Sequence, residues 1–240
     1  MIRASLVIIG DEILSGRTED KNLAYLAQWL GKLGIHLSEV RVVLDNESDI
    51  IEAVNSLRKK YDYVFTTGGI GPTHDDITTD SIAKAFGVKT RIDDDALAKM
   101  KEYLAGKELT EPLLKMLYIP EGGELIYSPA TKAPGYKIGN VFVMAGIPKI
   151  MQSMLEGMYD YLEKGQVVHS RSFDIMVGES FFAKELEQIQ NKFSDVDIGS
   201  YPFSRDGKYG ATLVIRSTNE KNLGVCENLV KQMISETNHE

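Results

Sequence analysis

The segment Thr66–Asp76, which reads TTGGIGPTHDD, places three glycines within four residues ahead of two adjacent carboxylates. Glycines let the backbone approach a ligand closely, and their amide groups can bind an anion. Asp75 and Asp76 offer oxygen ligands to a hard divalent cation and leave room for substrate phosphates. We therefore predict a phosphate and metal site here, whose substrate-binding residues are Thr67, Gly68, Gly69, Gly71, Pro72 and Thr73.

Two common phosphate-binding motifs are excluded for this segment. No Gly-Lys-Ser/Thr follows the glycines, so it is not a P-loop, and it does not follow the first predicted strand, as a dinucleotide fingerprint would. A purely structural interpretation also stays open. The glycines would then serve a tight strand–helix turn, and the aspartates would complement the positive end of the next helix.

Acidic residues also follow two other predicted strands. Gly10, Asp11 and Glu12 come after the first strand, and Asp45 comes after the second. Because parallel strands end at one edge of a sheet, these acids are expected to converge with the glycine segment. That combination suits metal-assisted chemistry on a phosphate or pyrophosphate. Loop capping by Asp11 and Glu12, and an Asx turn at Asp45, are the structural alternatives.

Two later segments could complete such a pocket. Lys132 and Gly135 lie in TKAPGY, where the lysine could approach an anion, and Gly146 and Pro148 lie in AGIP between a predicted strand and helix. A structural role is the alternative for each segment. No G-x-S-x-G elbow, Cys–His nucleophile pair or zinc-type His/Cys spacing occurs in the sequence.

The elements that must position these residues alternate in the first third of the chain. Apolar runs predict strands, and apolar residues at helical spacing predict helices between them. Ser48 and Thr78 are expected to cap two of the helices, and Gly34 and Gly87 to end two. The expected order is strand Leu6–Ile9, helix Asp20–Leu33, strand Val40–Leu44, helix Ser48–Leu57, strand Tyr63–Thr67 and helix Asp80–Phe86. This alternation predicts a mostly parallel sheet with helices on both faces, an α/β fold of three layers.

The rest of the chain is expected to finish this domain and to add a small one. The middle predicts helices Asp93–Ala105, Pro112–Leu117 and Pro148–Glu163, strands Leu125–Tyr127 and Val141–Met144, and turns over Ser128–Gly139. The tail predicts strand Val167–Val177, helix Glu179–Phe193, strands Val196–Pro202 and Tyr209–Ser217, and helix Glu220–Ser235. This β-α-β-β-α order is typical of a small α+β domain. We expect domains at residues 1–165 and 166–240.

Composition limits the possible partners and the compartment. A net charge of −8 argues against nucleic acid or an anionic membrane as partner. The apolar run in MIRASLVIIGDE is too short for a membrane span and stops at two acids, so it predicts a buried strand rather than a signal peptide. Cys226, the one cysteine in the sequence, is expected in the core. A cytoplasmic location is the expectation.

The motifs GDEILSG, DKN at Asp20–Asn22, TTGGIGPTHDDIT, KAPGY and AGIPKIM resemble those of the competence/damage-inducible protein A family. Its N-terminal region belongs to the molybdopterin-binding-domain superfamily, which includes the molybdenum-cofactor adenylyltransferases. The resemblance covers about residues 3–165 and, more loosely, the tail. It implies an α/β/α domain and a homodimer, and it adds Asn22 to the expected substrate-binding residues.

The resemblance also implies an activity. It points to hydrolysis of a nucleotide pyrophosphate such as ADP-ribose with a divalent metal (Mg²⁺, Mn²⁺ or Co²⁺). The two acids used by the related adenylyltransferases match Asp45 and Asp76, which we take as catalytic, with Asp11, Asp75 and Asp76 as metal ligands. The family often has a second acid after the one at Asp45, whereas this chain has Asn46. Many relatives carry an additional amidase domain for nicotinamide mononucleotide, and we do not expect that activity here.

Three hypotheses remain. The first is metal-dependent pyrophosphate hydrolysis, the second is adenylyl transfer to molybdopterin, and the third is a nucleotide- or pterin-binding domain without catalysis.

Overall fold

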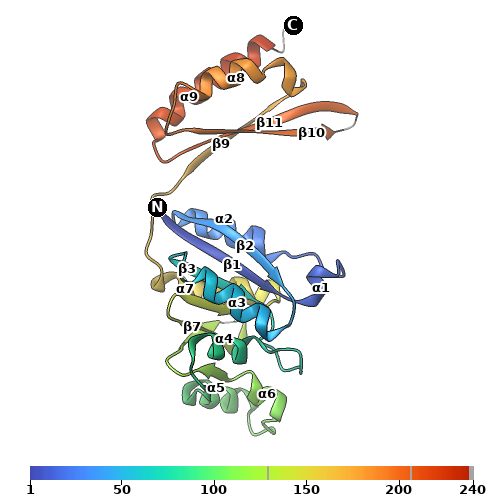
Figure 1. The fold of residues 1–240 in the computed structure, drawn as a ribbon, viewed down its shortest axis with the longest axis vertical. Helices are drawn as coiled ribbons and strands as arrows, with labels where there is room; N and C mark the ends of the chain where they lie inside the picture. The colour runs from blue at the N-terminus through green and yellow to red at the C-terminus, as the bar shows by residue number, and fades with distance from the viewer. Residues whose placement is uncertain (129, 206, 238–240) are drawn as a thin grey trace. The chain divides into compact units, whose positions relative to one another are not determined.

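The computed structural model of the chain describes residues 1–128, 130–205 and 207–237. It divides into two compact units, Met1–Gly165 and Gln166–Glu240. In Figure 1 the colour of the first unit runs from blue to yellow, and that of the second unit runs through orange to red.

The first unit is built on a six-stranded sheet with the order β2-β1-β3-β8-β7-β6. Its strands are β1 (Ile2–Ile9), β2 (Ile35–Val43), β3 (Tyr63–Thr67), β6 (Glu124–Ser128), β7 (Thr131–Ile138) and β8 (Val141–Met144). β1 pairs in parallel with both β2 and β3, and β3 pairs in parallel with β8. β7 runs antiparallel to both β8 and β6. The predicted mostly parallel α/β sheet is therefore confirmed.

Helices cover both faces of this sheet, which gives the three predicted layers (Figure 1). The covering helices are α2 (Asn22–Lys32) and α7 (Pro148–Met158) on one face, and α3 (Glu47–Leu57) and α4 (Thr78–Phe86) on the other. Side chains alternate along β1: Leu6 and Ile8 join the core under α2 and α7, whereas Val7 and Ile9 join the core under α3 and α4.

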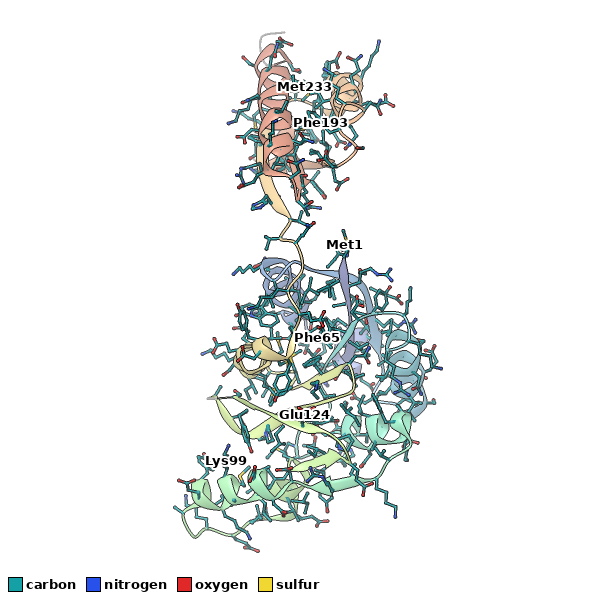
Figure 2. All side chains as sticks on the ribbon, turned by 90° about the vertical axis from the view of Figure 1, so that its left-hand side faces the viewer. Met1, Phe65, Lys99, Glu124, Phe193 and Met233 are labelled. Atoms are coloured by element: carbon teal, nitrogen blue, oxygen red, sulfur yellow. The ribbon has the colours of Figure 1, made fainter. Side chains whose placement is uncertain are left out.

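The buried strands are apolar on both faces, as a sheet between two helical layers requires. Phe65 of β3 lies inside the unit (Figure 2) and stacks on Phe142 of β8 with ring centroids 5.2 Å apart. This packing fixes the neighbouring strands β3 and β8, whose carboxyl ends carry Gly68 and Gly146.

Smaller elements complete the first unit. The short helix α1 (Asp11–Leu14) follows β1, and the 3₁₀ helix η1 (Tyr159–Tyr161) follows α7. Between α4 and β6 the chain forms β4 (Thr90–Ile92), α5 (Asp94–Leu104), α6 (Glu111–Lys115) and β5 (Tyr118–Pro120). β4 and β5 pair as a separate two-stranded antiparallel sheet.

Several local predictions were wrong. Asn46, not Ser48, caps α3, because its side chain accepts the amides of Ser48 and Asp49. Thr78 does not cap α4, since its hydroxyl donates to the carbonyl of Gly68 at 3.0 Å. Gly87 does end α4, with φ of 69°.

The largest difference concerns the stretch predicted as turns, Ser128–Gly139, most of which is the strand β7. Proline and glycine at positions 134 and 135 suggested turns, but they lie in a strand that pairs with β6 on one side and with β8 on the other. Gly135 is opposite Ile126, and a Cβ there would lie 2.6 Å from the Val143 carbonyl oxygen. Close strand packing, rather than a turn, therefore accounts for this glycine.

The second unit has a three-stranded antiparallel sheet with the order β10-β11-β9. Its elements are β9 (His169–Ile175), η2 (Glu179–Phe181), α8 (Ala183–Gln190), β10 (Asp197–Arg205), β11 (Lys208–Ser217) and α9 (Glu220–Thr237). The predicted order is confirmed, although the expected helix Glu179–Phe193 is split in two. Cys226 is fully buried between α9 and the sheet, as predicted.

None of the helices in the described residues combines the length and the apolar character that crossing a bilayer requires.

Candidate functional site

A cleft of about 560 Å³ lies at the carboxyl ends of the parallel strands. Each strand end contributes to its lining: Gly10 and Glu12 after β1, Asp45 after β2, Gly68–Pro72 with Asp75 and Asp76 after β3, and Ala145–Pro148 after β8. The structure thus brings together, in one cavity, residues that the sequence analysis took from separate motifs.

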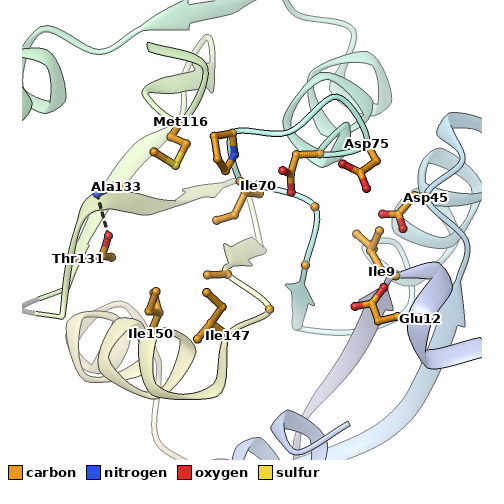
Figure 3. A pocket seen from close by; sticks show the side chains of 18 of the residues that line it. Ile9, Glu12, Asp45, Ile70, Asp75, Met116, Thr131, Ala133, Ile147 and Ile150 are labelled. Atoms are coloured by element: carbon orange, nitrogen blue, oxygen red, sulfur yellow. Dashed lines mark hydrogen bonds between the residues drawn. The ribbon is translucent and has the colours of Figure 1, made fainter. Parts of the chain in front are cut away.

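The lining has two chemically different sides (Figure 3). Glu12, Asp45 and Asp75 lie on one side, whereas Met116, Ile147 and Ile150 lie on the other. The glycine segment with Ile70 runs between them. A ligand that fills this cleft would meet polar oxygens at one end and an apolar surface suited to a flat ring at the other.

Asp45 is half-buried at the acidic side. Burial raises its pKa, and the nearby carboxylates of Asp11, Glu12 and Asp75 raise it further, whereas the hydrogen bond from the Asp11 amide opposes the shift. A cation or a hydrogen-bond donor placed here would relieve this repulsion.

Asp11 does not line the cleft. Its carboxylate accepts the amide of Asp45 at 2.9 Å, while its own amide donates to the Asp45 carboxylate at 3.0 Å. The adjacent acid, Glu12, is the one that lines the cavity, and its carboxylate lies over Gly10, where a Cβ would meet it at 2.7 Å.

Thr73 organises the two aspartates of the glycine segment. Its amide donates to Asp76 Oδ2 at 2.8 Å, and its hydroxyl lies 2.5 Å from both Asp75 Oδ1 and Asp76 Oδ2. The hydroxyl has one proton and donates to one of them at a time. The hydrogen bond from Thr73 is the main reason that the pKa of Asp75 is lowered. Thr73 therefore holds the aspartates in place and is not itself part of the lining.

The glycines of this segment are required by close backbone contacts. Gly68 has φ of 102°, and a Cβ there would lie 2.1 Å from the Ile9 carbonyl oxygen. Gly69 has φ of 67°, and a Cβ would lie 2.1 Å from Thr78 Oγ1. The amide of Gly68 is not available to a ligand, because it donates to the Met144 carbonyl at 3.1 Å. Within the described residues the amides of Gly69, Ile70 and Gly71 have no hydrogen-bond acceptor.

Asn22 and Thr67 are buried behind the cleft, with exposed fractions of 4% and 1%. Asn22 Nδ2 donates to the Gly146 carbonyl at 2.8 Å and so ties the start of α2 to the loop after β8. Both side chains line a neighbouring cavity of about 200 Å³ that also touches Glu12 and Gly146. Asn22 Oδ1 and Thr67 Oγ1 have no partner in the part of the chain that the structure describes.

Two predicted residues from the KAPGY motif remain. Gly135 lies inside β7 against Val143 and Met154 and does not itself line the cleft, although Met154 does. The other residue is Lys132, which was predicted to bind the substrate, and its side chain lies outside the described part of the structure.

Sequence reasoning missed the apolar part of the site. The residues it did not select are Ile9, Thr18, Ile70, Met116, Thr131, Ala133, Ala145, Ile147, Ile150 and Met154. Ile70, Ala145 and Ile147 stand inside recognised motifs, so their position next to the glycines was a usable signal. Met116 carries no such signal, since it enters the cleft from the segment between α6 and β5.

The expected divalent metal would take its protein ligands from the carboxylates of the cleft. In residues 1–128, 130–205 and 207–237, no group of three or more His, Cys, Asp or Glu side chains has the arrangement of a metal site. Mg²⁺ commonly uses one or two carboxylates and completes its shell with water and substrate phosphate. Asp45, Asp75 and Asp76 line one cavity, and any one or two of their carboxylates fit that mode of binding, in which metal and substrate bind together.

Comparison with known proteins gives two family matches. Residues 5–164 match the family described as "Probable molybdopterin binding domain", and residues 167–239 match the one described as "FAD synthase, middle domain". The two matches meet at the boundary between the compact units.

Individual relatives agree with these matches. A protein of Pyrococcus horikoshii is 32% identical, with 92% of this chain and 91% of that protein covered. A probable FAD synthase of Caenorhabditis elegans is 28% identical over 97% of this chain, which spans only half of that protein. The crystal structure of a Thermoplasma acidophilum protein titled CinA "with unknown function" is 36% identical, covers 66% of this chain and 96% of its own, and superposes with a TM-score of 0.62. The chain therefore belongs to the molybdopterin-binding-domain family, as a CinA-like member.

Proposed function

We propose that the first unit hydrolyses a nucleotide pyrophosphate of the ADP-ribose type with the help of a divalent metal. The observation that carries this proposal is the shared cleft, in which the carboxylates of Asp45, Asp75 and Asp76 line the same cavity as Gly69, Ile70 and Gly71, whose amides have no acceptor among the residues that the structure describes. Carboxylates alone would repel a phosphate, and amides alone would only bind it. Together they supply both a binding site for the anion and groups for acid–base or metal-assisted chemistry.

The two sides of the cleft fit the two parts of such a substrate. The amides of Gly69 and Gly71 donate to phosphate oxygens, and the apolar side with Met116, Ile147 and Ile150 holds the base. A carboxylate beside the phosphates accepts a proton from the attacking water. Water adds to one phosphorus, and the bond from that phosphorus to the bridging oxygen breaks. ADP-ribose and water thus yield AMP and ribose 5-phosphate, with the remaining water proton released to solvent or to the leaving phosphate.

One or two of the carboxylates of Asp45, Asp75 and Asp76 would hold the metal, which would supply positive charge to the phosphoryl group and lower the pKa of bound water. The raised pKa of Asp45 and the lowered pKa of Asp75 give these carboxylates different proton affinities. Asp45 is thus the better proton acceptor of the two, and Asp75 remains ionised over a wider pH range.

FAD is a second substrate of the same chemical class to be tested. The match of residues 167–239 and the C. elegans relative both carry the name FAD synthase. FAD and ADP-ribose share an adenosine joined through a pyrophosphate to a second group, so the same cleft would present the same bond to hydrolysis.

Adenylyl transfer to molybdopterin is the alternative that the family match favours, because residues 5–164 carry the molybdopterin-binding description. The apolar side of the cleft would hold the pterin as well as a nucleobase. This reaction consumes ATP and releases pyrophosphate, whereas the hydrolysis releases two monophosphates.

One experiment separates the hypotheses. The purified protein is incubated with ADP-ribose, FAD, nucleotide sugars or ATP plus molybdopterin, each with Mg²⁺, Mn²⁺ or Co²⁺, and the products are resolved by chromatography. Monophosphate pairs from ADP-ribose or FAD support the proposal, and an adenylated pterin supports the alternative. Binding of these ligands without any product under every metal contradicts both and leaves the non-catalytic hypothesis.

A further inference from the structure

A second cavity of about 240 Å³ lies on the other side of the glycine segment. Ile70, Gly71 and Asp76 line both this cavity and the main cleft, so the segment forms a wall between the two. The second cavity is polar, because Thr79, Asp80 and Lys115 complete much of its lining. None of these three residues was selected from the sequence.

Lys115 is the last residue of α6 and reaches the glycine segment from a part of the chain 42 positions further on. Its ammonium donates a hydrogen bond to the carbonyl oxygen of Thr73, the residue that holds Asp75 and Asp76. Its charge also contributes to the lowered pKa of Asp75. Lys115 therefore lies beside the residues that bind the phosphate and the metal in the proposed function.

The charges of the site show why this lysine matters. Glu12, Asp45, Asp75 and Asp76 line the main cleft. Among residues whose side chains the structure describes, Lys115 is the one lysine or arginine that lines either of the two cavities. A pyrophosphate that enters this acidic site needs positive charge, and amide groups supply only partial charges.

We propose that Lys115 binds the phosphate of the substrate at the wall between the two cavities. An ammonium has three donors, so Lys115 can keep the Thr73 carbonyl and bind a phosphate oxygen at the same time. A phosphate oxygen carries negative charge, so Coulomb attraction to the ammonium adds to the hydrogen bond and makes the phosphate the preferred partner over a neutral carbonyl. The inference rests on the proposed function for the class of ligand, but it requires only that a phosphate binds, not that it is hydrolysed.

The test measures binding rather than turnover. Isothermal titration calorimetry with inorganic pyrophosphate and with ADP, in the presence of Mg²⁺, compares the unmodified protein with Lys115→Met, Lys115→Gln and Lys115→Arg. Lys101→Met is the control, since Lys101 is an exposed lysine of α5 that lines neither cavity. Circular dichroism establishes that each variant is folded, and Lys115→Gln replaces Lys115→Met if the latter is not.

Loss of the ammonium is expected to weaken pyrophosphate binding by about 10-fold to 100-fold, since hydrogen bonds to charged groups are worth that much in affinity. Lys115→Arg keeps the charge and is expected to retain most of the pyrophosphate affinity. If Lys115 only held Thr73 in place, affinity would not follow the charge at position 115 in this way. Raising the salt concentration is expected to weaken pyrophosphate binding by the unmodified protein more than binding by Lys115→Met.

Unchanged affinity in folded Lys115→Met or Lys115→Gln overturns the proposal, as does a protein that binds neither pyrophosphate nor ADP. An equal loss in Lys101→Met also overturns it, because the effect would then reflect net charge. Binding that depends on Lys115 in a protein that hydrolyses no substrate supports this inference while contradicting the proposed hydrolysis.

Discussion

Asp11 and Asp45 hold each other through two reciprocal hydrogen bonds, in which the amide of each residue donates to the carboxylate of the other, at 3.0 and 2.9 Å. The pair joins the start of α1, which follows β1, to the loop after β2. Both segments meet the cleft, so this contact fixes the position from which the Asp45 carboxylate lines it. The two acids therefore have different roles, one inside the cleft and one behind it.

Replacement of Asp45 by Asn is expected to stabilise the protein at neutral pH while it removes activity. The pKa of Asp45 is raised in the folded protein, mainly by burial, so the folded state prefers the protonated form. The stability from this preference is present below the unfolded pKa and is lost as the pH rises through the folded pKa. At pH 7 the ionised Asp45 is thus unfavourable, and Asp45→Asn should raise the Tm by roughly 1–3 °C.

The pH dependence is the control for this prediction. Near pH 3 the carboxyl of Asp45 is largely protonated in both states, so the Tm difference between the variant and the unmodified protein should shrink to about zero. Differential scanning calorimetry at several pH values measures it. A stabilisation that is the same at pH 3 and pH 7 would mean that the charge of Asp45 is not its cause.

Replacement of Asp76 by Asn is expected to abolish turnover without unfolding the protein. The Asn oxygen can still accept the amide of Thr73, which donates to Asp76 Oδ2 at 2.8 Å, so the Tm should change by less than about 2 °C. Loss of the negative charge removes a proton acceptor and a metal ligand, and kcat on ADP-ribose should fall by about 100-fold or more. Asp49→Asn, in the first turn of α3, is the matched control. Undiminished kcat in Asp76→Asn would remove Asp76 from the mechanism.

The acidic and glycine-rich parts of the site could be predicted because they depend on local sequence and on one topological rule. Apolar runs place Gly10, Asp45 and Gly68 directly after strands, and parallel strands end at the same edge. The sequence does not indicate which of two adjacent acids faces a cavity. Asp11 and Glu12 both carry a carboxylate, and their roles differ because the carboxylate of Asp11 accepts the amide of Asp45, whereas Glu12 lines the cavity.

The Met116 part of the apolar side and the Lys115 part of the second cavity could not be predicted in this way, because they depend on contacts between distant segments. Thr131 lines the cleft as the first residue of the strand β7. Pro134 and Gly135 led to a prediction of turns for this stretch instead of a strand. The need for a glycine at position 135 comes from the Val143 carbonyl of the neighbouring strand. Lys115 contacts Thr73 because of the way α6 packs, and no local sequence pattern predicts a contact between residues 42 positions apart.

Replacement of Glu39 by Gln is expected to lower stability at neutral pH. Its carboxylate accepts from Lys60 Nζ at 2.7 Å, Tyr61 OH at 2.8 Å and Arg41 Nε at 3.0 Å, and these bonds, first that of Lys60, lower its pKa from 4.5 to about 2. The contribution is therefore complete above about pH 4.5 and is lost as the pH falls towards 2. Glu39→Gln should lower the Tm at pH 7 by roughly 2–4 °C.

The comparison variant for Glu39 is Glu52→Gln. Glu52 contacts the same Arg41 at 3.2 Å, but its side chain is 70% exposed, and exposed ion pairs contribute little. Thermal unfolding of both variants at pH 7 and near pH 2 measures the difference. A Tm loss in Glu39→Gln that persists undiminished at pH 2, or one that Glu52→Gln matches at pH 7, contradicts the assignment to the ionised carboxylate.

Replacement of Gly68 by Ala is expected to destabilise the first unit far more than replacement of Gly87 by Ala. Both glycines have positive φ, 102° and 69°, but a Cβ at Gly68 would lie 2.1 Å from the Ile9 carbonyl oxygen, whereas one at Gly87 meets no atom within 4 Å. Gly87→Ala should therefore cost only the backbone strain, about 1 kcal/mol or a Tm loss of roughly 2–4 °C. Gly68→Ala must also separate β1 from β3, so a Tm loss of more than about 8 °C, or insoluble protein, is expected. Equal Tm losses in the two variants would show that the contact with Ile9 does not determine this position, and that the glycine segment is not held where the cleft requires it.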